Sequence, residues 1–318
     1  MAWFSLPLRD KDVLPKGMDT FQERLVLSAF PAGSTIAEVK SYRPGYLHYP
    51  VRVRAQTPSG SVLGCVLKDD PFVGGVEREV RLLGVLRELG LSVPRVLIAP
   101  AEHPEYPRGG CLLVMEEMPG KPLSFCGKPS LDDMDLTCRL LPQAIRRLHE
   151  LTEAVRASAV GADLPARTLV DEYEEIQRVG GPCLDHPQVA EAMRALRPAL
   201  ERVATPLVFT NGDYNPINFL QHDGHLTAWL DFTHACFEDE LIDFGKFVAW
   251  SYDCGWWAAT KSGLIERFLY DRGLSRADFA PRLALRCLRL LQTDPNATPG
   301  DKYHQHMLAT LAAAMEWM

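Results

Sequence analysis

The sequence predicts an α+β protein of two lobes, a small β-rich first lobe with one main helix and a larger, mostly helical second lobe. Three observations support this. The length of 318 residues corresponds to about two units of roughly 150 residues. Alternating segments with β-branched residues fill the first part of the chain, and apolar positions at helical spacing dominate after residue 130. Pro119-Gly120 interrupts the chain between them, so we place the lobes at residues 1–118 and 119–318.

The first lobe is expected to be an antiparallel meander followed by a helix. Turn signals at 43–46 and 58–60 separate the first three strands. Val80, Leu83 and Leu86 recur at helical spacing, which predicts a helix over 77–89 that Gly90 ends. The predicted strands are residues 34–42, 51–56, 61–68, 93–98 and 111–115.

The second lobe is expected to be helical around one polar segment. Short apolar strands at 207–210 and 226–232 flank that segment, and Asp223-Gly224 predicts a hairpin turn between them. The predicted helices are residues 131–157, 186–203, 241–251, 258–270, 276–291 and 303–318.

The composition excludes several classes of protein. Apolar residues make up 47 % and charged residues 24 %, which is typical of globular chains and not of disordered ones. A net charge of -7 gives no basic footprint for nucleic acid or an anionic membrane. No apolar run reaches the roughly 18 residues of a spanning helix. Eight scattered cysteines without a C-x-x-C pair indicate reduced thiols, so we expect a cytoplasmic protein.

The most informative segment is residues 211–218, Asn-Gly-Asp-Tyr-Asn-Pro-Ile-Asn, followed by Trp-Leu-Asp-Phe at 229–232. Phosphoryl transfer needs a carboxylate that orients the attacking hydroxyl and oxygen ligands that hold Mg²⁺ against the phosphates. Asp213, Asn218 and Asp231 have the D-x-x-x-x-N…D spacing of kinases. An Asx-rich surface loop is the alternative interpretation, because Asn, Asp, Gly and Pro gather in turns.

Upstream residues strengthen the kinase interpretation because they occur in the expected order. Lys68 ends the third predicted strand, where it could reach the phosphates, and Glu79 on the next helix could hold it. Taken singly, each residue could equally be a solvated charge. The apolar strand at 112–115 runs into a short polar linker, where the backbone around Glu116 and Met118 could read the edge of a purine base.

Together these segments resemble the aminoglycoside phosphotransferase and choline kinase family, which has a protein-kinase-like fold. The family pattern H-G-D-x-x-x-x-N, then D-W or D-F, then D-P-x-x-D is similar to residues 211–218, 231–232 and 238–243 of this chain. The resemblance spans residues 34–249.

The resemblance implies a role for each matching residue. Asp213 would be the catalytic base or would orient the acceptor hydroxyl, and Asn218 and Asp231 would bind Mg²⁺. Lys68 would bind phosphate and Glu79 would hold it. The remaining matching positions are Glu116, Met118, Arg43 and Gly45 for the nucleotide, and Asn211 and Asp243 as supporting residues.

Three departures from the family pattern stand out. Asn211 occupies the position of a histidine, and Thr233 occupies a position where many members carry an acid. The turn expected to cover the phosphates, residues 43–48, contains one glycine and so offers few backbone N–H groups to phosphate.

The acceptor is expected between the catalytic segment and the C-terminal helices. Glu238 and Asp239 next to aromatic residues such as Trp256 would suit a cationic acceptor through ion pairing and cation–π contact. A solvated helix face is the alternative. Residues 282, 286 and 289 are arginines at helical spacing; they could form a local anion site, but we interpret them as a solvated face.

We therefore expect Mg²⁺-dependent transfer of the γ-phosphate of ATP or GTP to a hydroxyl of a small molecule. The resemblance favours an aminoglycoside-like antibiotic, and hence antibiotic resistance, or a related metabolite. The alternatives are choline, a sugar, homoserine or a macrolide as acceptor, or a catalytically weak pseudokinase that acts as a nucleotide-binding module. We expect no nucleic-acid or membrane partner, and the sequence carries no signal for an oligomeric state.

Overall fold

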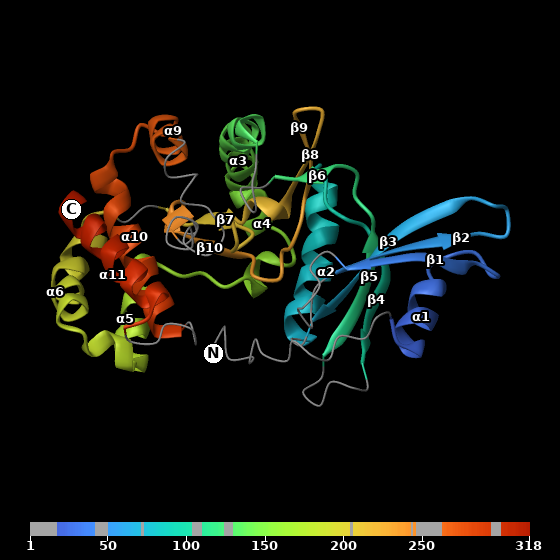
Figure 1. Ribbon diagram of the computed structural model, residues 1–318, viewed down its shortest axis with the longest axis horizontal. Helices are drawn as coiled ribbons and strands as arrows, with labels where there is room; N and C mark the ends of the chain where they lie inside the picture. Colours follow the sequence, from blue (N-terminus) through green and yellow to red (C-terminus); the bar gives the residue numbers. More distant parts are fainter. Residues whose placement is uncertain are drawn as a thin grey trace.

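The computed structural model describes residues 18–41, 50–70, 73–103, 110–123, 130–203, 206–242, 244–245, 263–293 and 300–318. Arg43, Gly45, Asp243 and Trp256 lie outside these residues. Figure 1 shows a strand-rich lobe at one end of the molecule and a helical lobe at the other, which confirms the predicted α+β class. In the described residues, no helix combines the length and the apolar character that a membrane span requires.

The first lobe is built on a five-stranded antiparallel sheet of order β1-β2-β3-β5-β4. Its helices are α1, which was not predicted, and α2, which begins four residues before the predicted start. The bounds are Thr35–Ser41 (β1), Val51–Gln56 (β2), Val62–Asp70 (β3), Val96–Glu102 (β4), Cys111–Glu116 (β5), Thr20–Leu27 (α1) and Val73–Glu88 (α2).

The two faces of this sheet carry different cores. Cys65 and Leu67 of β3 point to one face and pack with Val26 of α1. Lys68 alternates to the other face and pairs with Leu113 of β5, which packs in the same core as Leu82, Leu83 and Leu86 of α2. The strand period therefore places Lys68 on the face that α2 covers.

Short strands begin the second lobe and frame the polar segment. β6 (Lys121–Pro122) pairs with β8 (Phe219–His222), which forms a hairpin with β9 (His225–Trp229). Asp223 and Gly224 have φ values of 49° and 77°, which confirms the turn predicted at these residues, although the strand that precedes it, β8, was not predicted. β7 (Val208–Thr210) pairs with β10 (Cys236–Glu238), so residues 211–218 leave the end of one strand and enter another.

Helices make up the rest of the described second lobe. They are α3 (Leu131–His149), α4 (Thr152–Arg156), α5 (Leu169–Val179), α6 (Pro187–Arg202), α9 (Leu264–Tyr270), α10 (Arg276–Thr293) and α11 (Lys302–Trp317), with 3-10 turns at Gly161–Asp163, Pro182–Asp185 and Pro216–Asn218.

The predicted helix 131–157 is two helices. The hydroxyl of Thr152 donates to the carbonyl of His149 and accepts the N–H of Phe209, so it ties the break to β7. Helix α5 was missed, although Thr168 and Asp171 form a capping box that the sequence displays.

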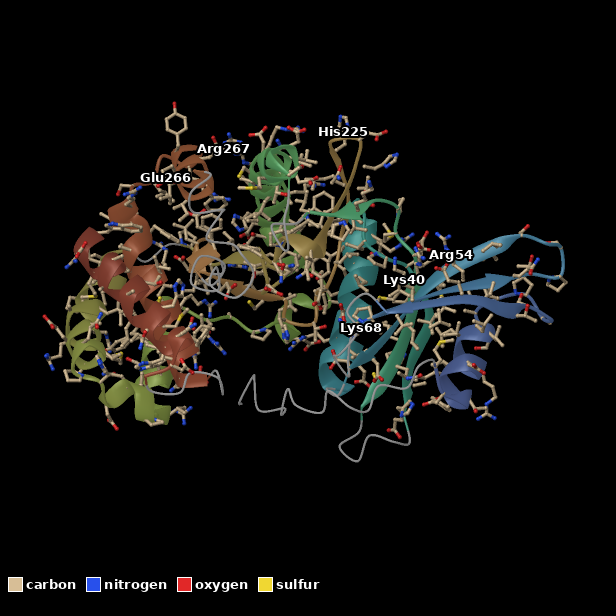
Figure 2. The ribbon with its side chains drawn as sticks, in the orientation of Figure 1. Lys40, Arg54, Lys68, His225, Glu266 and Arg267 are labelled. Carbon is tan, nitrogen blue, oxygen red and sulfur yellow. The ribbon has the colours of Figure 1, made fainter. Side chains whose placement is uncertain are left out.

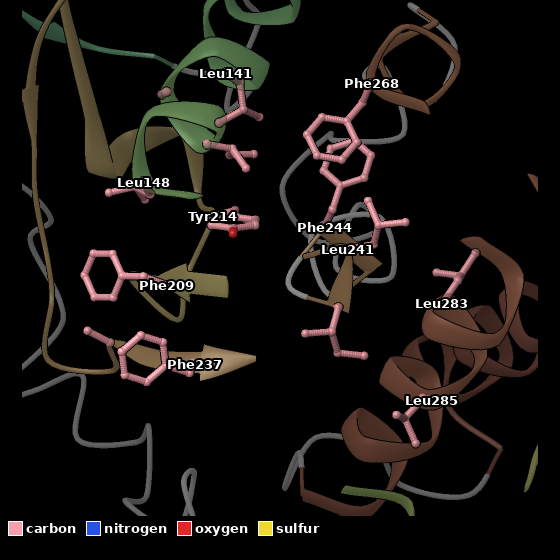
Figure 3. Packing of buried hydrophobic residues seen from close by; sticks show 14 of the residues in the cluster. Leu141, Leu148, Phe209, Tyr214, Phe237, Leu241, Phe244, Phe268, Leu283 and Leu285 are labelled. Atoms are coloured by element: carbon pink, nitrogen blue, oxygen red, sulfur yellow. The ribbon is translucent and has the colours of Figure 1, made fainter. Parts of the chain in front are cut away.

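Aromatic residues of the core anchor the polar segment. Figure 3 shows Phe209, Tyr214 and Phe237 packed near Leu148 of α3. The ring of Tyr214 is 1 % exposed, so the residue that follows Asp213 is fixed in the core. We infer that the loop carrying Asp213 has little freedom to move as a unit.

Candidate active site

Two asparagines hold Asp213 in the loop between β7 and β8. Asn211 donates its side-chain N–H to the carbonyl of Asp213 (3.0 Å) and accepts the Asp213 N–H (3.3 Å). Asn218 donates Nδ2 to the same carbonyl (3.1 Å) and to Oδ2 of Asp213 (3.2 Å). Both the backbone and one carboxylate oxygen of Asp213 are therefore oriented by amide groups. This is the bracing geometry that an asparagine at position 211 can supply in place of a histidine.

Gly212 lets this loop approach the segment that follows β9. Its φ is 73°, and a Cβ atom there would lie 2.1 Å from the carbonyl oxygen of His234. Its N–H donates to Oγ1 of Thr210 (3.0 Å), and that hydroxyl donates to Oε1 of Glu238 (3.0 Å). A side chain at position 212 would separate the two segments.

Lys68 lies where the two lobes meet, as Figure 2 shows. Its ammonium group donates to Oε2 of Glu79 (2.7 Å), to Oδ1 of Asp231 (3.0 Å) and to Oγ1 of Thr233. Lys68 is 9 % exposed and Glu79 is 2 % exposed. The structure thus brings together a strand, a helix and a loop, with Lys68 and Asp231 separated by 163 residues in the sequence.

Asp231 adopts a backbone conformation that is unusual for a residue with a side chain. Its φ of 55° lies in the left-handed region, which costs on the order of 1–2 kcal/mol for a residue other than glycine. Helix α2 holds the segment in place, because Glu79 Oε1 accepts the Phe232 N–H (3.0 Å) and Arg78 donates to the Thr233 carbonyl (3.0 Å). The strained turn directs the Asp231 carboxylate to Lys68.

The charges at this site stabilise one another. Desolvation alone would raise the pKa of Asp231, but the Lys68 ammonium and then His234 outweigh it, and the pKa lies well below its usual range. Desolvation alone would lower the pKa of Lys68, but Asp231 and Glu79 raise it above its usual range. The aspartate therefore remains ionised and the lysine protonated at neutral pH.

The donor set at this site fits a magnesium ion. Among the described residues, the Asn218 side-chain oxygen and the second carboxylate oxygen of Asp231 accept no hydrogen bond, and 40 % of the Asp231 side chain is exposed. Mg²⁺ is commonly held by one or two protein oxygens together with phosphates. In the described part of the chain, no group of three or more His, Cys, Asp or Glu side chains is arranged to hold a metal ion.

The face of the first-lobe sheet that packs against α2 carries charges that the sequence reasoning missed. Arg52 and Arg54 pair across the sheet with Val66 and Gly64, on the same face as Lys68. Glu117 lies over Gly64 and approaches both arginines (3.7 Å to each). Figure 2 labels Arg54 and Lys68 on this sheet. The alternation of apolar residues and arginines in 51–55 is the sequence signal that predicts a strand with one charged face.

The linker residues differ in where they point. The carboxylate of Glu116 accepts the backbone N–H of Arg95 (3.4 Å), so its side chain turns back to the first lobe. Met118 is half-buried.

Arg52 of β2 is held by Glu38 (2.8 Å), while its Nε is buried and has no hydrogen-bond partner within the described chain.

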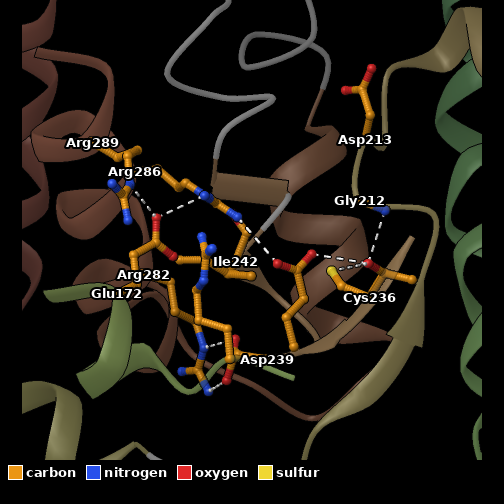
Figure 4. Close-up of polar contacts among 12 residues, drawn as sticks. Glu172, Gly212, Asp213, Cys236, Asp239, Ile242, Arg282, Arg286 and Arg289 are labelled. Carbon is orange, nitrogen blue, oxygen red and sulfur yellow. Dashed lines mark hydrogen bonds and ion pairs between the residues drawn. The ribbon is translucent and has the colours of Figure 1, made fainter. Parts of the chain in front are cut away.

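The second-lobe acids meet arginines instead of an open surface. Asp239 is 2 % exposed and accepts two hydrogen bonds from Arg282 (2.6 and 2.7 Å). Glu238, also buried, lies 3.4 Å from Arg286, which donates to Glu172 (2.9 Å) (Figure 4). These carboxylates do not face a free acceptor surface.

The interpretation of Arg282, Arg286 and Arg289 as a solvated face is therefore wrong. Arg282 is 2 % exposed and Arg286 is 9 % exposed, and Arg289 donates to Glu172 and Glu175. The helical spacing was visible in the sequence, but α5, which carries the two glutamates, was not predicted. A buried ion-pair network on α10 thus connects Glu172 of α5 to Glu238 of β10.

A second chain of polar contacts ends at Tyr214, the residue that follows Asp213. Arg272 donates to Nδ1 of His149 (3.1 Å), so the imidazole carries its proton on Nε2 and donates it to the hydroxyl of Tyr214 (2.7 Å). Arg272 also pairs with Glu240. Burial and then Arg272 lower the pKa of His149 to about 3. The residue beside Asp213 is thus fixed by a neutral histidine.

The family comparison agrees with this geometry. The model of the phosphotransferase enzyme family matches residues 50–280, which include all the polar contacts described around Lys68, Asp213 and Asp231. The chain belongs to this family. It is a small-molecule phosphotransferase of the kinase type. No curated protein matches the chain.

Solved structures show the same fold at low sequence identity. A thermostable mutant of the aminoglycoside phosphotransferase APH(4)-Ia in complex with ADP and hygromycin B has a TM-score of 0.63 and 15 % identity, covering 93 % of this chain and 98 % of that one. The GDP and kanamycin complex of APH(2")-IIIa has a TM-score of 0.61 and 16 % identity, covering 94 % and 98 %. A putative aminoglycoside phosphotransferase from Ralstonia eutropha has a TM-score of 0.56 and 15 % identity, covering 94 % and 97 %.

Proposed function

We propose that this chain transfers the γ-phosphate of ATP or GTP to a hydroxyl of a small molecule of the aminoglycoside class or a related metabolite. The observation that carries the proposal is the convergence of Lys68, Glu79 and Asp231 beside the loop that presents Asp213. A lysine, a glutamate and an aspartate from three separate segments supply the parts that phosphoryl transfer requires. The matching folds include proteins solved with ADP, GDP, hygromycin B and kanamycin, which supports a nucleotide donor and this acceptor class.

Each residue then has a chemical task. Asp213 accepts the proton of the acceptor hydroxyl or orients that hydroxyl, with its own carboxylate aligned by Asn218. Lys68 holds phosphate oxygens, and Glu79 keeps its ammonium extended. Asn218 and Asp231 would hold Mg²⁺, which when bound neutralises charge on the phosphates. Because carboxylates are weak bases, positioning and electrostatic stabilisation supply most of the rate.

The test is a Mg²⁺-dependent assay of nucleoside diphosphate release. ATP and GTP are offered with a panel of aminoglycosides, choline, amino alcohols, sugars, homoserine and macrolides. Asp213→Asn is the matched variant, because it keeps the size and the Asn218 contact of the side chain and removes its charge. We expect one acceptor class to raise turnover at least tenfold above the Asp213→Asn background. Equal turnover in both proteins with every acceptor, together with retained nucleotide binding, would indicate a nucleotide-binding module in place of an enzyme.

A further inference from the structure

The hydroxyl of Thr233 accepts an N–H of Lys68 that a phosphate oxygen of the donor nucleotide would otherwise accept. An ammonium group has three N–H donors, and in Lys68 all three are taken, by Glu79, Asp231 and Thr233. Thr233 is 6 % exposed and the Lys68 side chain 11 % exposed, so water has little access to replace a lost contact. Phosphate therefore has to displace one of these acceptors before Lys68 can bind it.

The three acceptors differ in how firmly they are held. Glu79 is fixed at both oxygens, because Oε1 accepts the Phe232 N–H and Oε2 accepts Lys68. Thr233 has one proton and two carboxylate oxygens within reach, Oε2 of Glu79 (3.0 Å) and Oδ1 of Asp231 (3.1 Å). It can donate to only one of them at a time while it accepts from Lys68.

We propose that Thr233 is a positioning residue whose hydroxyl makes donor binding depend on the divalent cation. Without the cation, the hydroxyl and Asp231 together occupy Lys68 and compete with phosphate oxygens for its N–H groups. If Asp231 binds the cation, the N–H that Lys68 donates to Asp231 becomes available to a phosphate oxygen. The Thr233 hydroxyl can then continue to accept from Lys68 and donate to Glu79. The inference rests on the proposed function, and it concerns a position where the family resemblance led us to expect an acid.

The test compares Thr233→Val, which keeps the shape of the side chain and removes the hydroxyl, with Thr233→Ser, which keeps the hydroxyl. The affinities for ADP and ATP are measured by calorimetric titration, first with protein dialysed against EDTA and then in excess Mg²⁺. We expect Thr233→Val to bind nucleotide about fivefold more tightly without the cation, the effect of one hydrogen bond. In Mg²⁺ this gain should shrink to about twofold or less, and Thr233→Ser should match the parent in both conditions.

A structural role for Thr233 would give a different pattern. If the hydroxyl only stabilised the fold, Thr233→Val would bind nucleotide equally or more weakly in both conditions, and this result would overturn the inference. Thermal unfolding of the ligand-free variants shows whether Thr233→Val is folded. If it is not, Thr233→Ala is titrated in its place with the same expectation.

The failure of the proposed function would look different again. A parent protein that binds neither ATP nor GTP in Mg²⁺ would overturn both proposals. A parent that binds nucleotide in Mg²⁺, with unchanged affinity in Thr233→Val under both conditions, would overturn the role of Thr233 alone. Inorganic tripolyphosphate, titrated in parallel, should show the same metal-free gain in Thr233→Val, because the competition is for phosphate oxygens. The absence of that gain would also overturn the inference.

Discussion

Replacing Gly212 by alanine perturbs the catalytic loop at its closest approach to another segment. The new Cβ would lie 2.1 Å from the His234 carbonyl oxygen, whereas real Cβ atoms essentially never come closer than 3.0 Å. The loop or the His234 segment must therefore move by about 1 Å. The φ of 73° adds about 1–2 kcal/mol for a residue with a side chain.

These terms set the expected size of the effect. We expect the free energy of unfolding to fall by about 3–4 kcal/mol, roughly half from the backbone and half from the displacement. An unfolding entropy of about 0.7 kcal/mol/K for a chain of this length converts this to a fall in Tm of about 5 °C. A displacement of about 1 Å at a catalytic group costs on the order of 10² in rate.

A second glycine gives the matched control. Gly90 has a φ of 78°, and a Cβ there would meet no atom within 4 Å. Gly90→Ala should therefore lose only the backbone contribution, about 1–2 kcal/mol, and keep its turnover. Scanning calorimetry and the diphosphate-release assay measure both quantities for both variants. The reasoning is refuted if Gly212→Ala equals Gly90→Ala in Tm and in rate.

Three further perturbations follow from the buried polar groups. Asp239→Asn and Arg282→Met should each lower the free energy of unfolding, measured in urea, by about 3–5 kcal/mol, because each single change leaves a buried charge without its partner. The double variant should lose clearly less than the sum of the two single losses. Additive losses would contradict this expectation. The parent should lose about 2 kcal/mol of stability between about pH 7.5 and about pH 5 through His149, which faces Arg272 and the Tyr214 hydroxyl. The folded pKa of His149, about 3, lies below the 6.5 of the unfolded chain, so this stability is present above pH 6.5 and is lost as the pH falls. His149→Asn should not show this loss. An equal acid sensitivity in that variant would refute the assignment. Glu79→Gln should weaken Mg²⁺–ATP binding about tenfold in calorimetric titration, because a charge-assisted contact to Lys68 becomes a neutral one, and an unchanged affinity would show that Glu79 does not position the lysine.

Much of the fold could be predicted because its signals are local. The period of two in 51–56 and the spacing of three and four in the helix around Leu83 and Leu86 are properties of short windows, and both elements lie near their predicted bounds. The break after His149 was missed, since it depends on the contact between Thr152 and Phe209, which are 57 residues apart.

The candidate site likewise has a part that the sequence predicted and a part that it did not. The order of Lys68, Asp213 and Asp231 along the chain, with Glu79 and Asn218 between them, indicated a kinase, although β3 extends to Asp70 and so runs two residues past the end that the sequence predicted. The surroundings of Arg282 and Asp239 could not be predicted, because an arginine at helical spacing has the same pattern whether its partner is water or a buried carboxylate from another element. Thr233 was noted in the sequence as a departure from the family pattern, while its contacts to Lys68 and Glu79 became visible only in three dimensions.

The linker between the lobes determines about which point the first lobe could rotate relative to the second. Residues 117–120 are all that separates β5 from β6, and both of these strands are paired into sheets. The hydroxyl of Thr227 donates to the carbonyl of Pro119 (2.7 Å), which pins the linker to the second lobe. The linker leaves β5 opposite Cys65 in the middle of β3, with Lys68 three residues further along that strand and the turn between β2 and β3 at the far end of the molecule (Figure 1). Because the linker joins two paired strands and is held by Thr227, a rotation of the first lobe about it would displace both Lys68 and that turn relative to the second lobe.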